Sequence, residues 1–335
     1  MNNYSIILPV RNGGEHVKEC VKSILSQTYT QFNLLVLDND SSDGTAEWIT
    51  LLKDERIIIY PADKSLGIED NWARIKDISK NEFITLIGHD DILQPDYLTV
   101  MDRLITKYPG ASLYQAHFNY IDSCGKVTRP CKAMPEKQEP AEVLANFISG
   151  KTDIIGTGFM MRSKDYDELG GIPAYPSLLF ADFELWINLA KKGFLAVAPE
   201  NVFAFRVHQS TTTLSSDTIM LKAFEQFINF LYRLKAADTE MEKVITTNAN
   251  ALLDFYCQGF TSRLLRTSMR KRNRQKVKSV INKFKEFAQQ LHPATDFKPL
   301  KNFTVRMALY IDSNSLTREI FLLFKRIYSK PFITR

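Results

Sequence analysis

The chain has 335 residues, of which 44% are hydrophobic and 24% are charged, and its formal net charge is +5. This composition is typical of a globular protein with a full core, and the length allows two domains or one large domain with an appendage. Every apolar run is far shorter than the roughly 20 residues of a membrane-spanning helix. Pro9 and Arg11 interrupt the first apolar run, so we expect no secretory signal and a cytoplasmic location.

Strands and helices are predicted to alternate over the first 110 residues. Four short apolar runs have the composition of strands covered on both faces. They are Ser5–Leu8, Leu34–Leu37, Ile57–Tyr60 and Phe83–Ile87. Apolar residues at helical spacing follow the first two runs, at 17–25 and 46–52. This alternation predicts βαβ units and a mostly parallel sheet flanked by helices.

Polar residues follow three of these strands. Arg11 comes after the first strand, Asp38 and Asn39 follow the second, and Asp90 and Asp91 follow the fourth. In parallel sheets ligands bind beyond the carboxyl ends of the strands, so these side chains are predicted to converge. Adjacent carboxylates repel each other and are costly to bury unpaired, so the acidic pair needs a cation, hydroxyl groups or solvent.

The pattern becomes irregular from about residue 111. A strand is predicted over Ile154–Arg162, a helix over Ala181–Gly193, and a strand that runs into a polar loop over Phe203–Thr213. Beyond about Asp217 the sequence has helical patterns to its end. We therefore expect a first domain at residues 1–214 and a helical region at residues 215–335. Basic residues are concentrated in that region, because residues 263–285 contain ten of them and no acidic residue.

Six motifs occur in order over residues 4–213. They are "LPVRN", "SILSQT", "LDNDSSDGT", "HDD", "FADFELW" and "RVH". Together they resemble the motifs of family 2 glycosyltransferases with the GT-A fold. The resemblance implies an α/β, Rossmann-like domain with a nucleotide-binding half at 1–110 and an acceptor half at 111–214. It also implies an inverting transferase that uses a nucleoside-diphosphate sugar and a divalent cation, Mg²⁺ or Mn²⁺.

By this resemblance the acidic pair binds the metal and the donor. Asp91 would be the direct metal ligand, and Asp90 would hold ribose hydroxyl groups or a metal-bound water. Oxygen ligands suit Mg²⁺ and Mn²⁺, which neutralise the departing diphosphate. His208 in "RVH" matches a loop that closes over the diphosphate and supplies a further metal ligand. The alternative interpretation makes the two acids a cap for the helix that starts near "QPDYL".

Other positions match the donor site of the family. The donor-binding residues implied by the resemblance are Pro9, Val10, Arg11, Asp38, Asn39, Gly67 and Asn71. Asn39 replaces the family's usual second Asp, and its amide oxygen accepts a hydrogen bond from a uracil ring without carrying charge. A UDP- or dTDP-type donor is therefore expected. The alternative for residues 38–43 is a turn that caps the next helix, and Ser41, Ser42 and Asp43 are suited to that role.

Asp182, in "FADFELW", matches the catalytic base of the family. It would take the proton from the acceptor hydroxyl as that group attacks the anomeric carbon. The family's usual Glu before the base is Ala181 here. Glu184 lies on a different helix face and is the less favoured base. The alternative interpretation makes Asp182 a helix N-cap.

The basic C-terminal region has an amphipathic pattern. Apolar residues of 277–291 form one helical stripe, which indicates a packing face first, and its basic surroundings also suit an anionic membrane. Residues 316–330 repeat the pattern. We expect the inner face of the plasma membrane to be contacted through 263–285 and 316–330, with a solvated helix face as the alternative. Nucleic acid is not expected as a partner, because no aromatic-studded binding face accompanies the cations.

The motifs together predict transfer of a single sugar to a hydroxyl of a glycan or lipid-linked glycan, in cell-surface polysaccharide or lipopolysaccharide biosynthesis. Chain-synthesising members of the family carry a Q-x-x-R-W motif, which this sequence lacks. Two alternatives stay open. One is a GT-A-like protein that binds sugar nucleotides with little catalysis. The other is a nucleotidyltransferase, although Gly13-Gly14 is a poor match for its glycine-rich phosphate loop.

Overall fold

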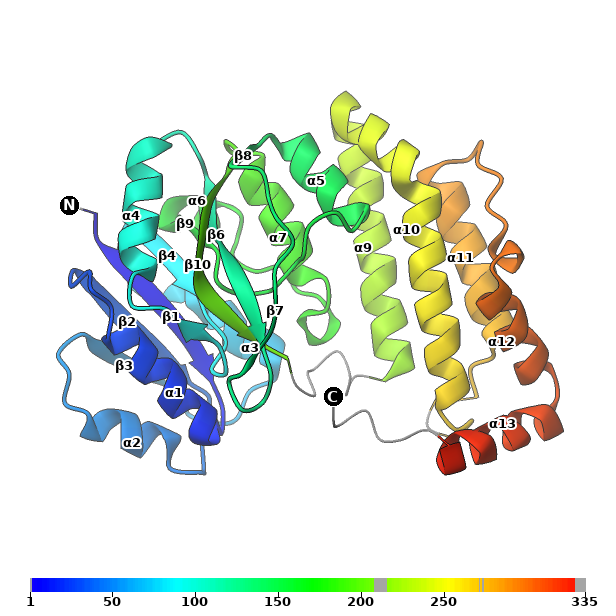
Figure 1. Cartoon of the computed structure of the whole chain (residues 1–335), viewed down its shortest axis with the longest axis horizontal. Helices are drawn as coiled ribbons and strands as arrows, with labels where there is room; N and C mark the ends of the chain where they lie inside the picture. The colour runs from blue at the N-terminus through cyan, green and yellow to red at the C-terminus, as the bar shows by residue number, and fades with distance from the viewer. Residues whose placement is uncertain (1, 208–215, 271, 273, 329–335) are drawn as a thin grey trace. The chain divides into compact units, whose positions relative to one another are not determined.

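The computed structural model describes residues 2–207, 216–270, 272 and 274–328 (Figure 1). The chain divides into two compact units, Met1–Thr213 and Leu214–Arg335. The first unit contains a sheet with helices beside it, and the described part of the second unit is helical. Among the described residues, no helix has the length and apolar character needed to cross a bilayer.

The first unit is built on one ten-stranded sheet, whose main path runs β3-β2-β1-β4-β9-β6-β10-β5. The strands are β1 Tyr4–Val10, β2 Phe32–Asp38, β3 Ile57–Pro61, β4 Phe83–Leu86, β5 Ile92–Leu93, β6 Leu113–Ile121, β7 Val127–Pro130, β8 Lys137–Gln138, β9 Met160–Arg162 and β10 Leu195–Arg206. All residues of β1 and β4 are buried, as predicted for strands covered on both faces. The α/β fold class is therefore confirmed.

Parallel pairing is confined to two parts of the sheet. The neighbours β3, β2, β1 and β4 are parallel, and so are β6 and β10. The other strands, including β9 between β4 and β6, pair antiparallel. In the parallel half Val10 pairs with Asp38, so the carboxyl ends of β1 and β2 meet at one edge of the sheet. The polar residues that follow these strands begin at that edge.

Helices flank the sheet of the first unit (Figure 1). They are α1 Gly14–Leu25, α2 Thr45–Leu51, α3 Ile68–Ala73, the 3₁₀ turn η1 Arg74–Asp77, α4 Tyr97–Lys107, α5 Pro140–Ile148, α6 Ser163–Glu168, the 3₁₀ turn η2 Pro176–Leu178 and α7 Ala181–Ala190. In α1 the residues Val17, Cys20, Val21 and Ile24 are buried. Their three- and four-residue spacing forms the apolar stripe expected of a helix that packs on a sheet.

The strand prediction for Ile154–Arg162 was wrong over its first part. Only Met160–Arg162 forms a strand, and the preceding residues form a loop. Gly158 has a φ of +78°, and a β-carbon there would lie 2.9 Å from the Phe203 ring. Both constraints favour glycine and interrupt an extended strand. The strand predicted from Phe203 begins earlier, at Leu195, and ends at Arg206.

The second unit consists of α9 Asp217–Ala237, α10 Thr239–Arg266, α11 Val277–Leu291, the 3₁₀ turn η3 Pro299–Lys301, α12 Phe303–Ser313 and α13 Ser315–Tyr328. Its core contains an aromatic cluster in which Phe224 stacks on Phe284 with ring centroids 5.2 Å apart. The seven apolar residues of the α11 stripe are buried. The packing interpretation of that stripe is confirmed, so its apolar side chains are not available to a membrane.

One buried ion pair crosses the second unit. The Arg272 guanidinium and the Asp312 carboxylate are in contact, with side chains that are 0% and 3% exposed. Asp312 also accepts a hydrogen bond of 2.8 Å from the Val277 backbone N–H, and Arg272 donates one of 3.1 Å to the Leu264 carbonyl. The pair therefore connects α10, α11 and α12.

We predict that Asp312→Ala lowers the free energy of unfolding by about 3–5 kcal/mol, because it leaves the Arg272 charge buried without its partner. Chemical denaturation followed by circular dichroism measures the loss. Glu319→Ala is the matched control, because this acid is exposed on α13, and its effect stays within about 0.5 kcal/mol. Equal stability of the two variants would contradict the assignment.

Candidate active site

The acidic pair lies in the turn that follows β4. Asp91 is 2% exposed, whereas Asp90 is half-buried. The Thr157 hydroxyl donates a hydrogen bond of 2.6 Å to Asp91 Oδ2, and the Arg206 backbone N–H donates one of 3.0 Å to Asp91 Oδ1. Asp91 is thus fixed between the loop before β9 and the end of β10. The capping alternative for the pair is wrong, because Asp96 occupies the N-cap position of α4.

The two carboxylates converge on the space beside Gly88. A β-carbon on Gly88 would lie 2.8 Å from Asp90 Oδ1 and 3.0 Å from Asp91 Oδ2. Burial, together with the neighbouring charge of Asp90, raises the pKa of Asp91 to about 8. A bound cation would offset both effects, and oxygen ligands are those that Mg²⁺ and Mn²⁺ prefer. The residues present therefore fit a divalent cation.

Protein groups alone do not complete a metal site in the described part of the chain. No group of three or more His, Cys, Asp and Glu residues there is arranged to hold a metal ion. His208, the predicted further ligand, lies outside the described residues. Oxygen atoms of a bound diphosphate would have to supply the remaining ligands.

Arg206 was noted in the sequence only as the first residue of "RVH", and the structure gives it a central position. Its side chain is 0% exposed and forms a 2.6 Å ion pair with Glu19 of α1. It also donates a hydrogen bond of 2.7 Å to the Asp90 carbonyl, and 3.1 Å bonds to the carbonyls of Asp122 and Ser123. Arg206 therefore fastens the acidic turn to α1 and to the turn between β6 and β7.

Asp182 lies in the first turn of α7, and the N-cap position belongs to Phe180, so the capping alternative for Asp182 is also wrong. Its carboxylate faces the loop before β9, because a β-carbon on Gly156 would lie 3.4 Å from Asp182 Oδ2. Burial raises the pKa of Asp182 to about 6. A carboxyl group with this pKa is ionised at neutral pH and still basic enough to accept a proton.

The loop at residues 155–158 joins the two acidic sites. Its first residue accepts a hydrogen bond of 3.0 Å from the Trp186 indole of α7, and its Thr157 binds Asp91. Gly156 lies against Asp182 between these two contacts. Sequence reasoning assigned this loop to a strand and missed Thr157, because a hydroxyl that contacts a carboxylate 66 residues away leaves no local pattern.

The predicted nucleotide residues divide into two kinds. Asp38 is 4% exposed, and its Oδ2 accepts a 3.2 Å bond from the Ser41 backbone, while its buried Oδ1 has no hydrogen-bond partner within the described residues. Asn39 differs, because both ends of its amide bind the backbone of Leu66, at 2.8 and 3.0 Å. Asn39 therefore holds the loop before α3, and Asp38 has the unsatisfied acceptor oxygen at the sheet edge.

Gly67 and Asn71 are held close to that edge. Gly67 occupies the N-cap position of α3, and Asn71 is buried. Arg74 donates hydrogen bonds to Asn71 Oδ1 at 2.9 Å and to the carbonyl of Asp38 at 3.0 Å. It also binds the last two carbonyls of β3. Arg74 therefore fixes the α3 residues to the ends of β2 and β3.

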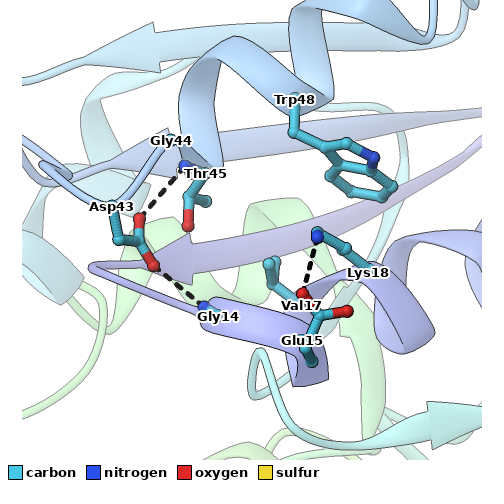
Figure 2. A pocket seen from close by; sticks show the side chains of 8 residues that line it. All are labelled: Gly14, Glu15, Val17, Lys18, Asp43, Gly44, Thr45 and Trp48. Atoms are coloured by element: carbon cyan, nitrogen blue, oxygen red, sulfur yellow. Dashed lines mark hydrogen bonds and ion pairs between the residues drawn. The ribbon is translucent and has the colours of Figure 1, made fainter.

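The remaining predicted donor residues lie on β1 and in the loop that follows it. Pro9 and Val10 are buried at the end of β1, and Arg11 is exposed. Beside this loop, Asp43 accepts 3.0 Å hydrogen bonds from the backbone N–H groups of Gly14 and Thr45, so it joins the start of α1 to the start of α2 (Figure 2). Asp43 thus binds the backbone N–H of the first residue of α2, but the N-cap position of that helix belongs to Gly44.

Figure 2 shows the small pocket between these helix starts, which has a volume of about 120 Å³. Asp43, Trp48 and Lys18 are among the residues that line it. A hydrogen bond from the Thr45 hydroxyl lowers the pKa of Asp43. Ligand pockets usually enclose about 300–1,000 Å³, so this one is too small for a nucleotide sugar. The donor residues described above lie at the sheet edge, outside its wall.

The sequence and the fold of this chain are similar to those of known glycosyltransferases. The family model described as "Glycosyl transferase family 2" matches residues 5–170. Glycosyltransferase GlyG of Streptococcus pneumoniae is 24% identical over 123 residues, which cover 36% of this chain and 41% of GlyG. The chain thus spans less than half of that relative. The Escherichia coli UDP-Glc:alpha-D-GlcNAc-diphosphoundecaprenol beta-1,3-glucosyltransferase WfgD is 24% identical over 221 residues, covering 65% of this chain and 82% of WfgD.

The crystal structure of S. aureus TarS 1–349 in complex with UDP-GlcNAc resembles this chain with a TM-score of 0.65 at 13% identity. The likeness covers 99% of this chain and 94% of the TarS chain, and at this identity it shows the fold. The family match, the relatives and the shared fold confirm the resemblance read from the six motifs. The chain belongs to glycosyltransferase family 2 and has the GT-A fold.

Proposed function

We propose that the protein is a metal-dependent, inverting glycosyltransferase that moves one sugar from a UDP- or dTDP-type donor to a hydroxyl of a glycan or lipid-linked glycan. The observation that carries this proposal is the loop at 155–158, which contacts both the acidic pair and the separate carboxylate of Asp182. Such an arrangement provides a site for the leaving diphosphate and, apart from it, a base for the attacking hydroxyl. WfgD transfers glucose to a GlcNAc-diphosphoundecaprenol acceptor, which supports a lipid-linked acceptor and a role in cell-surface polysaccharide biosynthesis for this chain.

The acidic pair would bind the cation, which supplies positive charge to the departing diphosphate. The sequence motifs predicted Asp91 as the residue that binds the metal directly. Both Asp91 oxygens accept hydrogen bonds from the protein, whereas Asp90 is more exposed and lies on the same convergent space. Both carboxylates can therefore contact the cation, Asp91 through the lone pairs that its hydrogen bonds leave and Asp90 through its more exposed group. His208 stays a predicted further ligand.

Donor recognition would use the edge at the ends of β1 and β2. The unsatisfied Oδ1 of Asp38 is suited to accept a hydrogen bond from a nucleobase N–H or a ribose hydroxyl. Asn39 would act indirectly, since its amide already binds Leu66. Pro9, Val10 and the α3 residues would form the wall of the nucleotide pocket, and Arg11 would add positive charge close to the diphosphate.

Asp182 would remove the proton from the acceptor hydroxyl. Because its pKa is about 6, the carboxylate form predominates at neutral pH. Protonation removes the base, so activity depends on the ionised form and is lost as the pH falls through 6. Glu184, on the same helix, accepts a hydrogen bond from the Tyr175 hydroxyl and is committed to that contact.

We predict that Asp182→Asn lowers kcat by about 10²–10⁴-fold, the usual contribution of a general base, without weakening donor binding. For the parent enzyme, kcat/KM falls about tenfold per pH unit below the pKa of this group. Steady-state rates across pH 5–8 measure both effects. Glu184→Gln is the matched control and keeps most of the activity. If Glu184→Gln is inactive and Asp182→Asn active, the base is misassigned.

We also predict that Asp90→Ala abolishes metal-dependent donor binding, because the convergent site loses the carboxylate that faces the ligand. Calorimetric titration of UDP with Mn²⁺ and with EDTA measures the loss. Glu47→Ala, at an exposed acid on α2, is the control and leaves binding unchanged. Unaltered, metal-dependent UDP binding by Asp90→Ala would exclude Asp90 as a ligand.

A further inference from the structure

Helix α13 turns an apolar face to solvent. Leu316, Ile320 and Leu323 are 66%, 57% and 58% exposed. Their spacing of four and then three residues places them on one side of the helix. An amphipathic helix that packs on a protein core normally buries this side, and grouped exposed apolar side chains indicate an interaction surface.

The opposite side of α13 faces the protein and contains polar groups. Arg318 is 13% exposed, and the Lys325 ammonium donates a hydrogen bond of 3.3 Å to the backbone carbonyl of Arg266. This bond places α13 against the C-terminal end of α10, where Figure 1 also shows it. The orientation of α13 within the second unit therefore leaves Leu316, Ile320 and Leu323 outward.

Exposed cations lie near the C-terminal part of α13. The connection from α10 to α11 starts at Arg266, the residue that Lys325 contacts, and the basic side chains that are exposed along it and at the start of α11 are Arg266, Arg270, Arg274, Lys276 and Lys278. No acidic residue occurs from 263 to 285. The connection therefore presents charge of one sign next to an exposed apolar helix.

Helix α12 extends the exposed apolar character. Phe303, Met307 and Tyr310 have the same four- and three-residue spacing as the α13 residues and are 65%, 38% and 65% exposed. The Arg306 guanidinium lies 5.7 Å from the centroid of the Phe303 ring. Aromatic side chains with adjacent cations are typical of elements that lie in the interface of a bilayer.

We propose that the outer face of α13, together with the basic connection between α10 and α11, docks on an anionic lipid bilayer. The apolar side chains would enter the boundary between headgroups and acyl chains, and the cations would contact anionic headgroups. An anionic bilayer complements both the apolar face and the basic connection. A second copy of this chain would bring an identical basic connection to the interface, and the like charges would repel each other. This inference does not depend on the proposed sugar transfer.

The apolar contribution is tested with the full chain by vesicle flotation. Vesicles of phosphatidylcholine mixed with phosphatidylglycerol are compared with vesicles of phosphatidylcholine alone. The parent chain floats with the mixed vesicles, and the double variant Ile320→Ser/Leu323→Ser loses about tenfold or more in binding. Leu51→Ser is the matched control, because this leucine is 73% exposed on α2 of the first unit and its loss leaves binding unchanged.

The electrostatic contribution is tested by Arg270→Glu/Arg274→Glu. Each cation near an anionic surface contributes roughly fivefold to binding, so this variant binds the mixed vesicles at least tenfold more weakly. Parent binding also falls as salt is raised. The replaced side chains are all exposed, so circular dichroism and the melting temperature stay at parent values and exclude unfolding as the cause.

Three results would overturn the proposal. The first is flotation of the apolar double variant equal to that of the parent. The second is binding that does not require phosphatidylglycerol. The third is a parent chain that does not bind vesicles and instead sediments as a dimer, while the variant Ile320→Ser/Leu323→Ser sediments as a monomer. Donor hydrolysis in vesicle-free solution reports on the sugar-transfer proposal alone, so failure of either proposal is recognised separately.

Discussion

The architecture of the site depends on the burial of Asp91 next to a second carboxylate, Asp90. The turn after β4 places the two carboxylates around the space beside Gly88, and burial adds to the cost of keeping Asp91 charged. Folding tolerates this cost because Thr157 and the Arg206 backbone donate hydrogen bonds to Asp91. A bound cation would stabilise the charged form of Asp91, so the feature that is unfavourable in the free protein would favour the proposed binding of a metal and a diphosphate.

Arg206 extends this constraint through the first unit. Its buried guanidinium joins α1, the acidic turn and the turn between β6 and β7, and the ion pair with Glu19 compensates its charge. The loop at 155–158 makes a second connection, from the acidic turn to the start of α7. The parts of the site that we propose to bind the metal and to carry the base are therefore positioned by side chains that belong to neither.

The sequence predicted those parts of the protein that have local patterns. The apolar runs indicated β1 and β2, and the motif "HDD" indicated the acidic turn, since both consist of contiguous residues. The contacts that depend on distant residues were not predictable. Thr157 and the Asn39–Leu66 pairing join segments far apart in the chain, and the glycine conformation in the loop before β9 interrupted a run that reads as a strand. The outward face of α13 has the same helical periodicity as a packing face, so only the three-dimensional arrangement distinguishes the two.

Turnover of a panel of sugar nucleotides shows whether this protein transfers a sugar and whether it needs a metal to do so. The parent protein is incubated with UDP-, dTDP- and GDP-sugars, with Mn²⁺ and with EDTA, and release of the nucleoside diphosphate is measured. We expect release of the nucleoside diphosphate from a UDP- or dTDP-sugar, and we expect this release to require the metal and to stop with EDTA. Binding of a donor without any metal-dependent release would contradict this expectation and would indicate a GT-A protein that binds sugar nucleotides without transferring the sugar.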